Sequence, residues 1–135
     1  MISSKKITDI FGVWILDKDL DCGKGFCHED IYIQNIAGIY KGRDNLQDAY
    51  KKIINTFTFS RVEFLEVVKQ GEKGYLEWSG SLNLEQKWNE FDKSLGRTVE
   101  AKGIILVEFS ESGLLKKWYA QNTLLTEMAR LNARH

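Results

Sequence analysis

Apolar residues in three parts of the chain recur with the period of an α-helix. The first set consists of Ile7, Ile10, Phe11, Trp14 and Ile15. The second set follows Asp44 and consists of Leu46, Ala49, Tyr50, Ile53 and Ile54. The third set consists of Leu124, Leu125, Met128 and Leu131. Because spacings of three and four residues place side chains on one side of a helix, the pattern predicts helices over about 4–21, from Asp44 onward, and over 124–132.

Between these segments apolar and polar residues alternate, which is the period of a strand. Residues 31–36 predict a short strand, 56–69 and 75–82 the arms of a long hairpin, and 97–109 the first arm of a second hairpin. Long strands that follow helices and pair with their neighbours are typical of an α+β domain. We expect a strongly twisted antiparallel sheet with helices on one face and a cleft between the two layers.

The alternation also predicts how the strands pair. In the first hairpin the even-numbered positions are the more apolar, so we expect them to face one another, with Glu66 opposite Trp78. The odd-numbered positions then form the wetter face, and they include Arg61, Glu63, Glu77, Phe57, Phe59, Leu65, Val67 and Tyr75. In the second hairpin a turn at 112–113 places Gly103 opposite Asn122.

Residues 83–96 fit either a helix or an extension of the preceding strand. Their apolar members recur with helical spacing and are Leu84, Trp88, Phe91 and Leu95. Asn83 suits the N-cap of a helix and Gly96 its end. We therefore favour a short helix here.

The composition limits the class of protein. With 135 residues, 43% of them hydrophobic and 28% charged, the chain has the size and composition of one globular domain spanning 1–135. Its 19 basic and 19 acidic residues leave no net charge, so nucleic acid is not an expected partner. No apolar run approaches the ~20 residues that cross a bilayer, and the N-terminus lacks the pattern of a secretory signal. Two cysteines make no disulfide framework, which favours a reduced, cytoplasmic protein.

Several short segments, in order over about 120 residues, match the signatures of one superfamily. They are Trp14 with Asp17 and Asp19, residues 28–35, Gly42-Arg43-Asp44, Trp78-Ser79-Gly80-Ser81, Gly96-Arg97-x-Val99, and Trp118 with Leu124, Leu125 and Met128. Together they resemble the SnoaL-like families of the nuclear-transport-factor-2-like superfamily, which includes polyketide cyclases, ketosteroid isomerases, limonene epoxide hydrolases and scytalone dehydratases. The resemblance implies a cone-shaped α+β fold around a pocket, and sheet-to-sheet homodimers are common among such proteins.

The sequence departs from this family at the positions that carry its chemistry. The last strand of SnoaL-type cyclases carries an acid/base Asp four residues after the Trp, and here that position is Asn122. An amide does not accept a proton at neutral pH, so this general-base role is lost. Members with a Gly-Thr-His signature would place the His at position 82, which is Leu82 here, and Asn35 lacks the proline that usually follows it. The resemblance therefore implies a pocket but not the known reaction.

Two polar residues remain as weak catalytic candidates. Asn122 either offers a hydrogen bond to a ligand or caps the final helix, the commoner role of an Asn at such a position. Glu66, on the more apolar face of its strand, either has a raised pKa beside Trp78 or lies near the turn in water, and the second is favoured because Glu is rarely buried without a partner. Arg61, Glu63 and Glu77 on the wet face are expected to form cross-strand ion pairs.

Large aromatic side chains are usually core residues, but the resemblance raises the chance that some line a pocket. The residues expected to contact a substrate are Trp14, Tyr32, Phe64, Trp78, Gly103, Trp118 and Asn122. Cys27, His28, Glu29 and Asp30 are adjacent but lack metal-ligand spacing, so we expect neither a metal nor a cofactor.

Two classes of function stay open. The first is a SnoaL-like cyclase, isomerase or lyase of altered chemistry, acting on a small apolar or aromatic molecule. The second is a non-catalytic ligand-binding or dimerisation module, in which side chains fill the pocket. The wet face of the long hairpin carries apolar residues, which predicts a symmetric homodimer.

Overall fold

The computed structural model describes residues 4–88 and 95–133 of the chain. Its α-helices are α1 (Ser4–Phe11), α2 (Leu20–Gly23), α3 (Leu46–Thr56) and α4 (Leu124–Ala133). Shorter helical turns are η1 (Gly12–Leu16), η2 (Lys24–Phe26) and η3 (Arg43–Asn45). The strands are β1 (Cys27–Asn35), β2 (Gly38–Lys41), β3 (Phe57–Gln70), β4 (Lys73–Leu84), β5 (Thr98–Phe109) and β6 (Leu115–Asn122).

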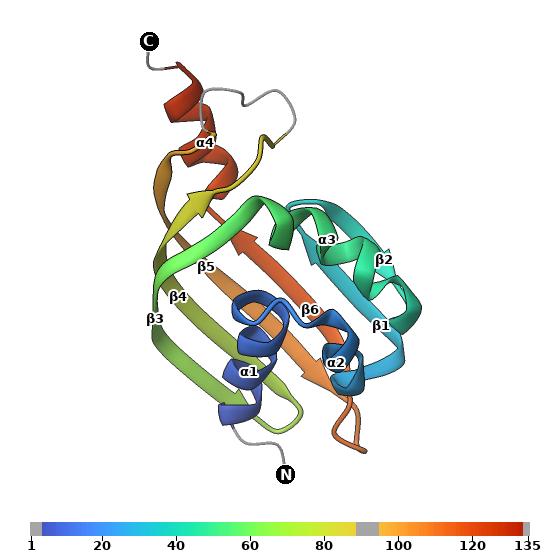
Figure 1. Cartoon of the computed structure of the whole chain (residues 1–135). Helices are drawn as coiled ribbons and strands as arrows, with labels where there is room; N and C mark the ends of the chain where they lie inside the picture. The colour runs from blue at the N-terminus through green and yellow to red at the C-terminus, as the bar shows by residue number, and fades with distance from the viewer. Residues whose placement is uncertain (1–3, 89–94, 134–135) are drawn as a thin grey trace.

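The six strands form one mixed sheet in the order β2-β1-β6-β5-β4-β3. Helices α1, α2 and α3 lie over one face of this curved sheet, and α4 lies at one end of it (Figure 1). The expected α+β class and both long hairpins are confirmed. The sheet is not wholly antiparallel, since β1 and β6 run parallel. β1 and β6 are far apart in the sequence, and the alternation of apolar and polar residues within a strand does not indicate which distant strand it pairs with.

The first helix is interrupted where the sequence predicts it to continue. After α1 the backbone widens into a π-helical turn, in which Asp17 N–H donates to Gly12 O at 2.7 Å. Asp19 then caps α2 by accepting a hydrogen bond from Cys22 N–H at 3.0 Å. Trp14 lies on the π turn and is fully buried. The apolar stripe therefore faces the core as predicted, although its first part lies on an α-helix and its second part on a π-helical turn.

Two β-bulges in β3 correct the predicted register of the first hairpin. One follows Phe59 and the other follows Phe64, and each shifts the pairing with β4 by one residue. Phe64 therefore pairs with Trp78, and Glu66 pairs with Glu77 instead of Trp78. Because each extra residue exchanges the two faces of a strand, Phe57, Phe59 and Val67 pack against the core. Their predicted place on the wet face is wrong.

The second hairpin has the predicted register. Gly103 pairs with Asn122, and Glu108 pairs with Lys117 across the same two strands. Trp78 and Trp118 both face the interior and are 4% and 0% exposed. This hairpin and the helices on it position the interior site described below.

The segment after β4 is not the predicted helix as far as it is described. Asn83 and Leu84 belong to β4, and residues 85–88 have no regular secondary structure. Trp88 is buried and packs against Phe57, with ring centroids 5.7 Å apart. Residues 89–94, which include Phe91, lie outside the described residues. None of the described helices is long and apolar enough to cross a membrane.

Candidate functional site

An interior cavity of about 50 Å³ lies between the sheet, α1 with η1, and α3. Its apolar walls are Phe11, Ile15, Ile36, Ile53, Ile54, Phe57, Phe59, Trp78, Leu82, Ile105, Ala120 and Leu124. Three polar side chains complete the lining, and they are Asn35, Tyr50 and Asn122. No charged side chain of the described residues lines it. The cavity can therefore bind uncharged groups and has no ionised partner to offer.

Asn122 caps the final helix, which is one of the two roles considered for it. Its Oδ1 accepts a hydrogen bond from the backbone N–H of Leu124 at 3.0 Å, where α4 begins. This bond fixes the orientation of the amide. Across residues 4–88 and 95–133 we find no acceptor for its Nδ2, which belongs to a side chain that lines the cavity. Asn122 thus holds the start of a helix, and its amide N–H group has no partner within the described residues.

Tyr50 extends from α3 to the cavity and is 2% exposed. Its hydroxyl accepts a hydrogen bond from Trp118 Nε1 at 2.7 Å. Burial raises the pKa of Tyr50 to about 12, although hydrogen bonds with Trp118 and Asn35 act in the opposite direction. The phenol therefore stays protonated at neutral pH and is a hydrogen-bond donor, not a base.

Asn35 has both ends of its amide occupied. Its Nδ2 donates to the backbone oxygen of Ala49 at 2.8 Å, and its Oδ1 accepts from Ala37 N–H at 2.8 Å. These bonds tie the β1–β2 turn to α3. Asn35 consequently shapes the wall of the cavity, and its polar atoms are already used by the protein.

Of the residues predicted to contact a substrate, Trp78 and Asn122 line the cavity. Trp14 and Trp118 are fully buried and do not line the cavity, and their ring centroids are 4.8 Å apart. Trp14 Nε1 donates to Gly23 O at 3.1 Å, so both indoles are held by the protein itself.

Three other predicted contact residues lie elsewhere. Phe64 is 38% exposed on the edge strand and packs edge-on against Phe11. Tyr32 lies on the opposite face of the sheet, where Lys117 Nζ is 6.0 Å from its ring centroid. Gly103 is outside the lining, but a side chain there would meet Trp78 and Asn122.

Glu66 does not reach the cavity. The second bulge of β3 turns it to the outer face, where it is exposed and pairs with Glu77. The predicted contact with Trp78 is wrong, so the physical reason for a raised pKa is lost. Among the described residues, the cavity lining contains neither a carboxylate nor a histidine.

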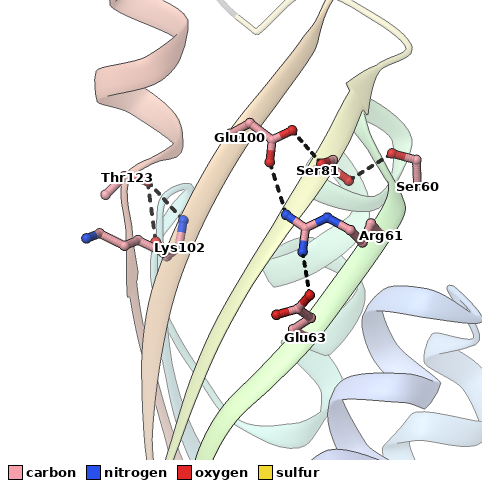
Figure 2. A network of polar contacts seen from close by, with 7 residues as sticks. All are labelled: Ser60, Arg61, Glu63, Ser81, Glu100, Lys102 and Thr123. Carbon is pink, nitrogen blue, oxygen red and sulfur yellow. Dashed lines mark hydrogen bonds and ion pairs between the residues drawn. The ribbon is translucent and has the colours of Figure 1, made fainter.

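The outer face of the sheet carries a polar network (Figure 2). Arg61 lies 3.2 Å from Glu63 and 3.1 Å from Glu100, and Ser81 Oγ donates to Glu100 at 2.6 Å. The hydrogen bond from Ser81, helped by Arg61, lowers the pKa of Glu100. The ion pair between Arg61 and Glu100 runs from β3 to β5, as expected of a cross-strand pair, whereas Arg61 and Glu63 both lie on β3. The network lies on the side of the sheet away from the cavity.

The cluster at the start of β1 is not assembled around a metal. His28 Nδ1 accepts a hydrogen bond from Asp30 N–H at 3.1 Å. Cys27 is buried, and burial raises the pKa of its thiol to about 11. Within the described parts of the chain, no three His, Cys, Asp or Glu side chains form a group that could hold a metal ion.

Sequence reasoning missed Tyr50 and Asn35 as lining residues. The helical spacing of the apolar residues predicts that Tyr50 is buried, and the structure confirms this. The available signal was a hydroxyl within that stripe, because a buried Tyr needs a polar partner and such partners gather near cavities.

The pKa of Tyr50 gives a prediction for alkaline pH. Because its pKa is about 12 when folded and 10.0 ordinarily, its contribution to stability is complete below pH 10 and is lost between about pH 10 and 12. Two pKa units correspond to about 2.7 kcal/mol. We expect the free energy of unfolding, measured by urea titration from pH 9 to 12, to fall more steeply for the wild type than for Tyr50→Phe. Parallel curves would contradict the assignment.

The geometry defines an α+β cone, a curved sheet wrapped around helices with a small cavity between them. This is the nuclear-transport-factor-2-like fold, and the resemblance to SnoaL-like proteins is confirmed at the level of fold. No protein-family model matches the sequence, and no curated protein is similar enough in sequence to be matched.

Three solved structures illustrate the likeness. A candidate polyketide cyclase from Xanthomonas campestris pv. campestris superposes with a TM-score of 0.74 at 13% identity, over 95% of this chain and 96% of that one. An LEH-like epoxide hydrolase from Mycobacterium tuberculosis gives 0.67 at 13% identity, over 97% and 90%. A nuclear-transport-factor-2-like protein of unknown function from Cytophaga hutchinsonii gives 0.57 at 13% identity, over 90% and 91%. Identities this low show the fold and not the activity.

Proposed function

We propose that the protein binds a small, uncharged, largely apolar molecule in the interior cavity. The observation that carries this proposal is the cavity lining, in which apolar walls surround the donor of Asn122 and the hydroxyl of Tyr50. Binding pockets for small organic molecules commonly combine apolar walls with a few placed polar groups. A candidate polyketide cyclase and an epoxide hydrolase share the fold, which supports an organic ligand.

The size of the cavity restricts the ligand. A volume of about 50 Å³ is well below the ~300–1,000 Å³ of pockets for drug-sized molecules. A short chain of a few heavy atoms fits this space as it stands, whereas a single ring requires the walls to move, because an apolar cavity that binds benzene measures about 150 Å³. Ile15, Ile54 and Phe59 are half-buried lining residues, and larger ligands require them to move aside.

We propose no aldol-cyclase or isomerase turnover at this site. At the position where the resemblance implies a catalytic Asp, Asn122 cannot remove a proton from carbon at neutral pH. Glu66 is outside the site, and Tyr50 with a pKa of about 12 is protonated. The ligand-binding module is therefore favoured over the enzyme of altered chemistry. We also propose that the protein works in a reducing compartment such as the cytoplasm, because the two cysteines of the chain, Cys22 and Cys27, are free.

A ligand screen tests this proposal. We expect single-ring ketones and hydrocarbons to raise the melting temperature of the wild type, and Ala120→Leu, which fills the cavity, to abolish the effect. Asn122→Asp should keep most of the stability, because Asp caps helices about as well as Asn. Cyclase or isomerase turnover that persists in Asn122→Ala would overturn the non-catalytic assignment, and ligand shifts that persist in Ala120→Leu would overturn the cavity as the site.

We also propose that two copies associate through the outer face of the sheet. Exposed or half-buried apolar side chains form a band across β3, β4, β5 and β6, and they are Leu65, Val68, Tyr75, Ile104, Leu106 and Tyr119. Val68 pairs with Tyr75, Tyr75 with Leu106, and Leu106 with Tyr119, so the band is continuous. Continuous exposed apolar patches are typical of interaction surfaces. Phe57, Phe59 and Val67, which the sequence also predicts on this face, pack against the core instead. They are therefore not part of the band.

Light scattering tests the association. We expect the mass of a dimer for the wild type at micromolar concentration, and the mass of a monomer for Leu106→Glu, because a charge at the centre of the band would be buried without a partner. Leu16→Glu is the matched control, since Leu16 is 39% exposed and Leu106 is 41% exposed, but Leu16 lies on η1. A monomeric wild type would exclude the proposal.

A further inference from the structure

One short segment of the cavity wall departs from regular backbone geometry. This segment, called the flap below, is residues 15–19 between α1 and α2, on the face of the sheet that the helices cover (Figure 1). Its first part belongs to the π-helical turn η1, and such turns often occur at functional sites. Lys18 has a φ of 58°, and among the described residues no other residue except glycine has a positive φ. A left-handed lysine is strained, so contacts elsewhere have to hold it in place.

The contact that holds Lys18 crosses to the sheet. Lys18 Nζ donates a hydrogen bond to Thr58 Oγ1 at 2.7 Å, and both residues are half-buried. Thr58 lies on β3 between Phe57 and Phe59, which both line the cavity. Ile15, three residues before Lys18, lines the same cavity from the flap. The bond therefore fastens the flap to the strand beside the cavity.

We infer that the flap is the part of the wall that opens to admit a ligand, and that the hydrogen bond between Lys18 and Thr58 is its latch. This inference rests on the proposed function and adds to it the route by which the ligand enters. Because both residues are half-buried, water can replace each partner when the bond breaks. Opening therefore leaves no buried polar group unpaired.

Buried residues on either side limit how far the flap can move. Trp14 is fully buried and Leu20 is 3% exposed, so the two ends of the flap are anchored in the core. Between these anchors Leu16, Asp17 and Asp19 are exposed. The flap can therefore turn outward while the packing of the core at both ends is kept.

The other half-buried apolar residues of the lining lie on elements with more support. Ile54 is within the 11-residue α3, and Phe59 and Ala120 are on strands paired with a neighbour. Asn35 ties the turn that carries Ile36 to α3. Moving any of these elements disrupts backbone hydrogen bonds of a helix or a sheet, whereas the flap is joined to the sheet by a side-chain hydrogen bond.

NMR measures the opening with and without a ligand. The probe is 1-fluoropropane, a short chain, and fluorine line shapes report its exchange between the free and bound states. We expect Lys18→Met and Thr58→Val each to exchange the probe roughly tenfold faster than the wild type, with a similar Kd, because one hydrogen bond is lost from the closed state. Without any probe, the amide protons of Asp17 and Asp19, which donate to Gly12 O and Val13 O, should exchange with solvent roughly tenfold faster.

Two comparisons separate the latch from a general loosening. Lys6 Nζ donates to Gly113 O, also at 2.7 Å and also half-buried, but Lys6 lies on α1 and does not line the cavity. Lys6→Met should therefore leave both rates unchanged. Because the latch is a single interaction, the double variant Lys18→Met with Thr58→Val should be no faster than either single variant.

Each outcome bears on one claim. Wild-type rates in either latch variant, a double variant that multiplies the two single effects, or equal acceleration in Lys6→Met overturns the latch while the cavity remains a binding site. If the amides exchange faster but 1-fluoropropane does not bind the wild type, the proposed function fails and the flap is not a ligand entrance. Faster probe exchange in the latch variants, absent in Lys6→Met, supports the inference.

Discussion

Replacing Trp118 by alanine is expected to lower the free energy of unfolding by roughly 4 kcal/mol, the cost of emptying a site filled by a fully buried aromatic residue. The indole packs against Trp14 and donates to the hydroxyl of Tyr50. Its loss removes both contacts and leaves a cavity. Urea unfolding monitored by circular dichroism would measure the change.

Two further variants serve as comparisons for Trp118→Ala. Trp118→Phe should cost less than Trp118→Ala, because a ring still fills most of the space, although Tyr50 loses the donor that it faces. Lys116→Ala, at an exposed position two residues earlier on β6, should change stability by less than ~0.5 kcal/mol. A small effect of Trp118→Ala would mean that the indole is not part of a packed interior.

Gly103→Ala is expected to destabilise the fold by about 2 kcal/mol, as overpacking in a core does. A Cβ there would lie 2.7 Å from Trp78 Nε1, 2.8 Å from Asn122 Cβ and 2.8 Å from the backbone oxygen of Gln121. The Gln121 oxygen belongs to the neighbouring strand and cannot retreat without bending the sheet. Thermal unfolding of the variant would show a lowered midpoint.

The control for this prediction is Gly25→Ala. A Cβ at Gly25 meets no atom within 4 Å, so the substitution should be close to neutral. Because the crowding at Gly103 also falls on Trp78 and Asn122, Gly103→Ala should weaken ligand binding in addition to stability. A Gly103→Ala protein as stable as Gly25→Ala would contradict the close approach of β4, β5 and β6 at this point.

The parts of the fold that depend on local pattern were predictable from the sequence. The stripe of α3 and the register that places Gly103 opposite Asn122 both follow from spacing and from one turn. Residues 83–84 were not predictable in the same way. Their helical spacing competes with pairing to β3 and β5, which is a tertiary effect.

The candidate site was predicted in part. Asn122 and Trp78 were expected at the cavity and line it, because both lie on strands whose face the alternation defines. Glu66 was misplaced, since a bulge adds one residue and leaves no mark in a pattern of period two. Tyr50 was missed because periodicity reports that a residue is buried, and not what its hydroxyl faces.

The two bulges of β3 have a consequence for how the protein behaves in a crowded solution. β3 is 14 residues long and forms one border of the sheet, so its free backbone groups offer a template on which another chain could add a strand. Each bulge breaks the regular spacing of those groups, and Arg61 and Glu63 place charges between them. The stretches left in regular register are only a few residues long. The long edge strand is thereby divided into segments too short for another chain to pair with along their length, which opposes aggregation.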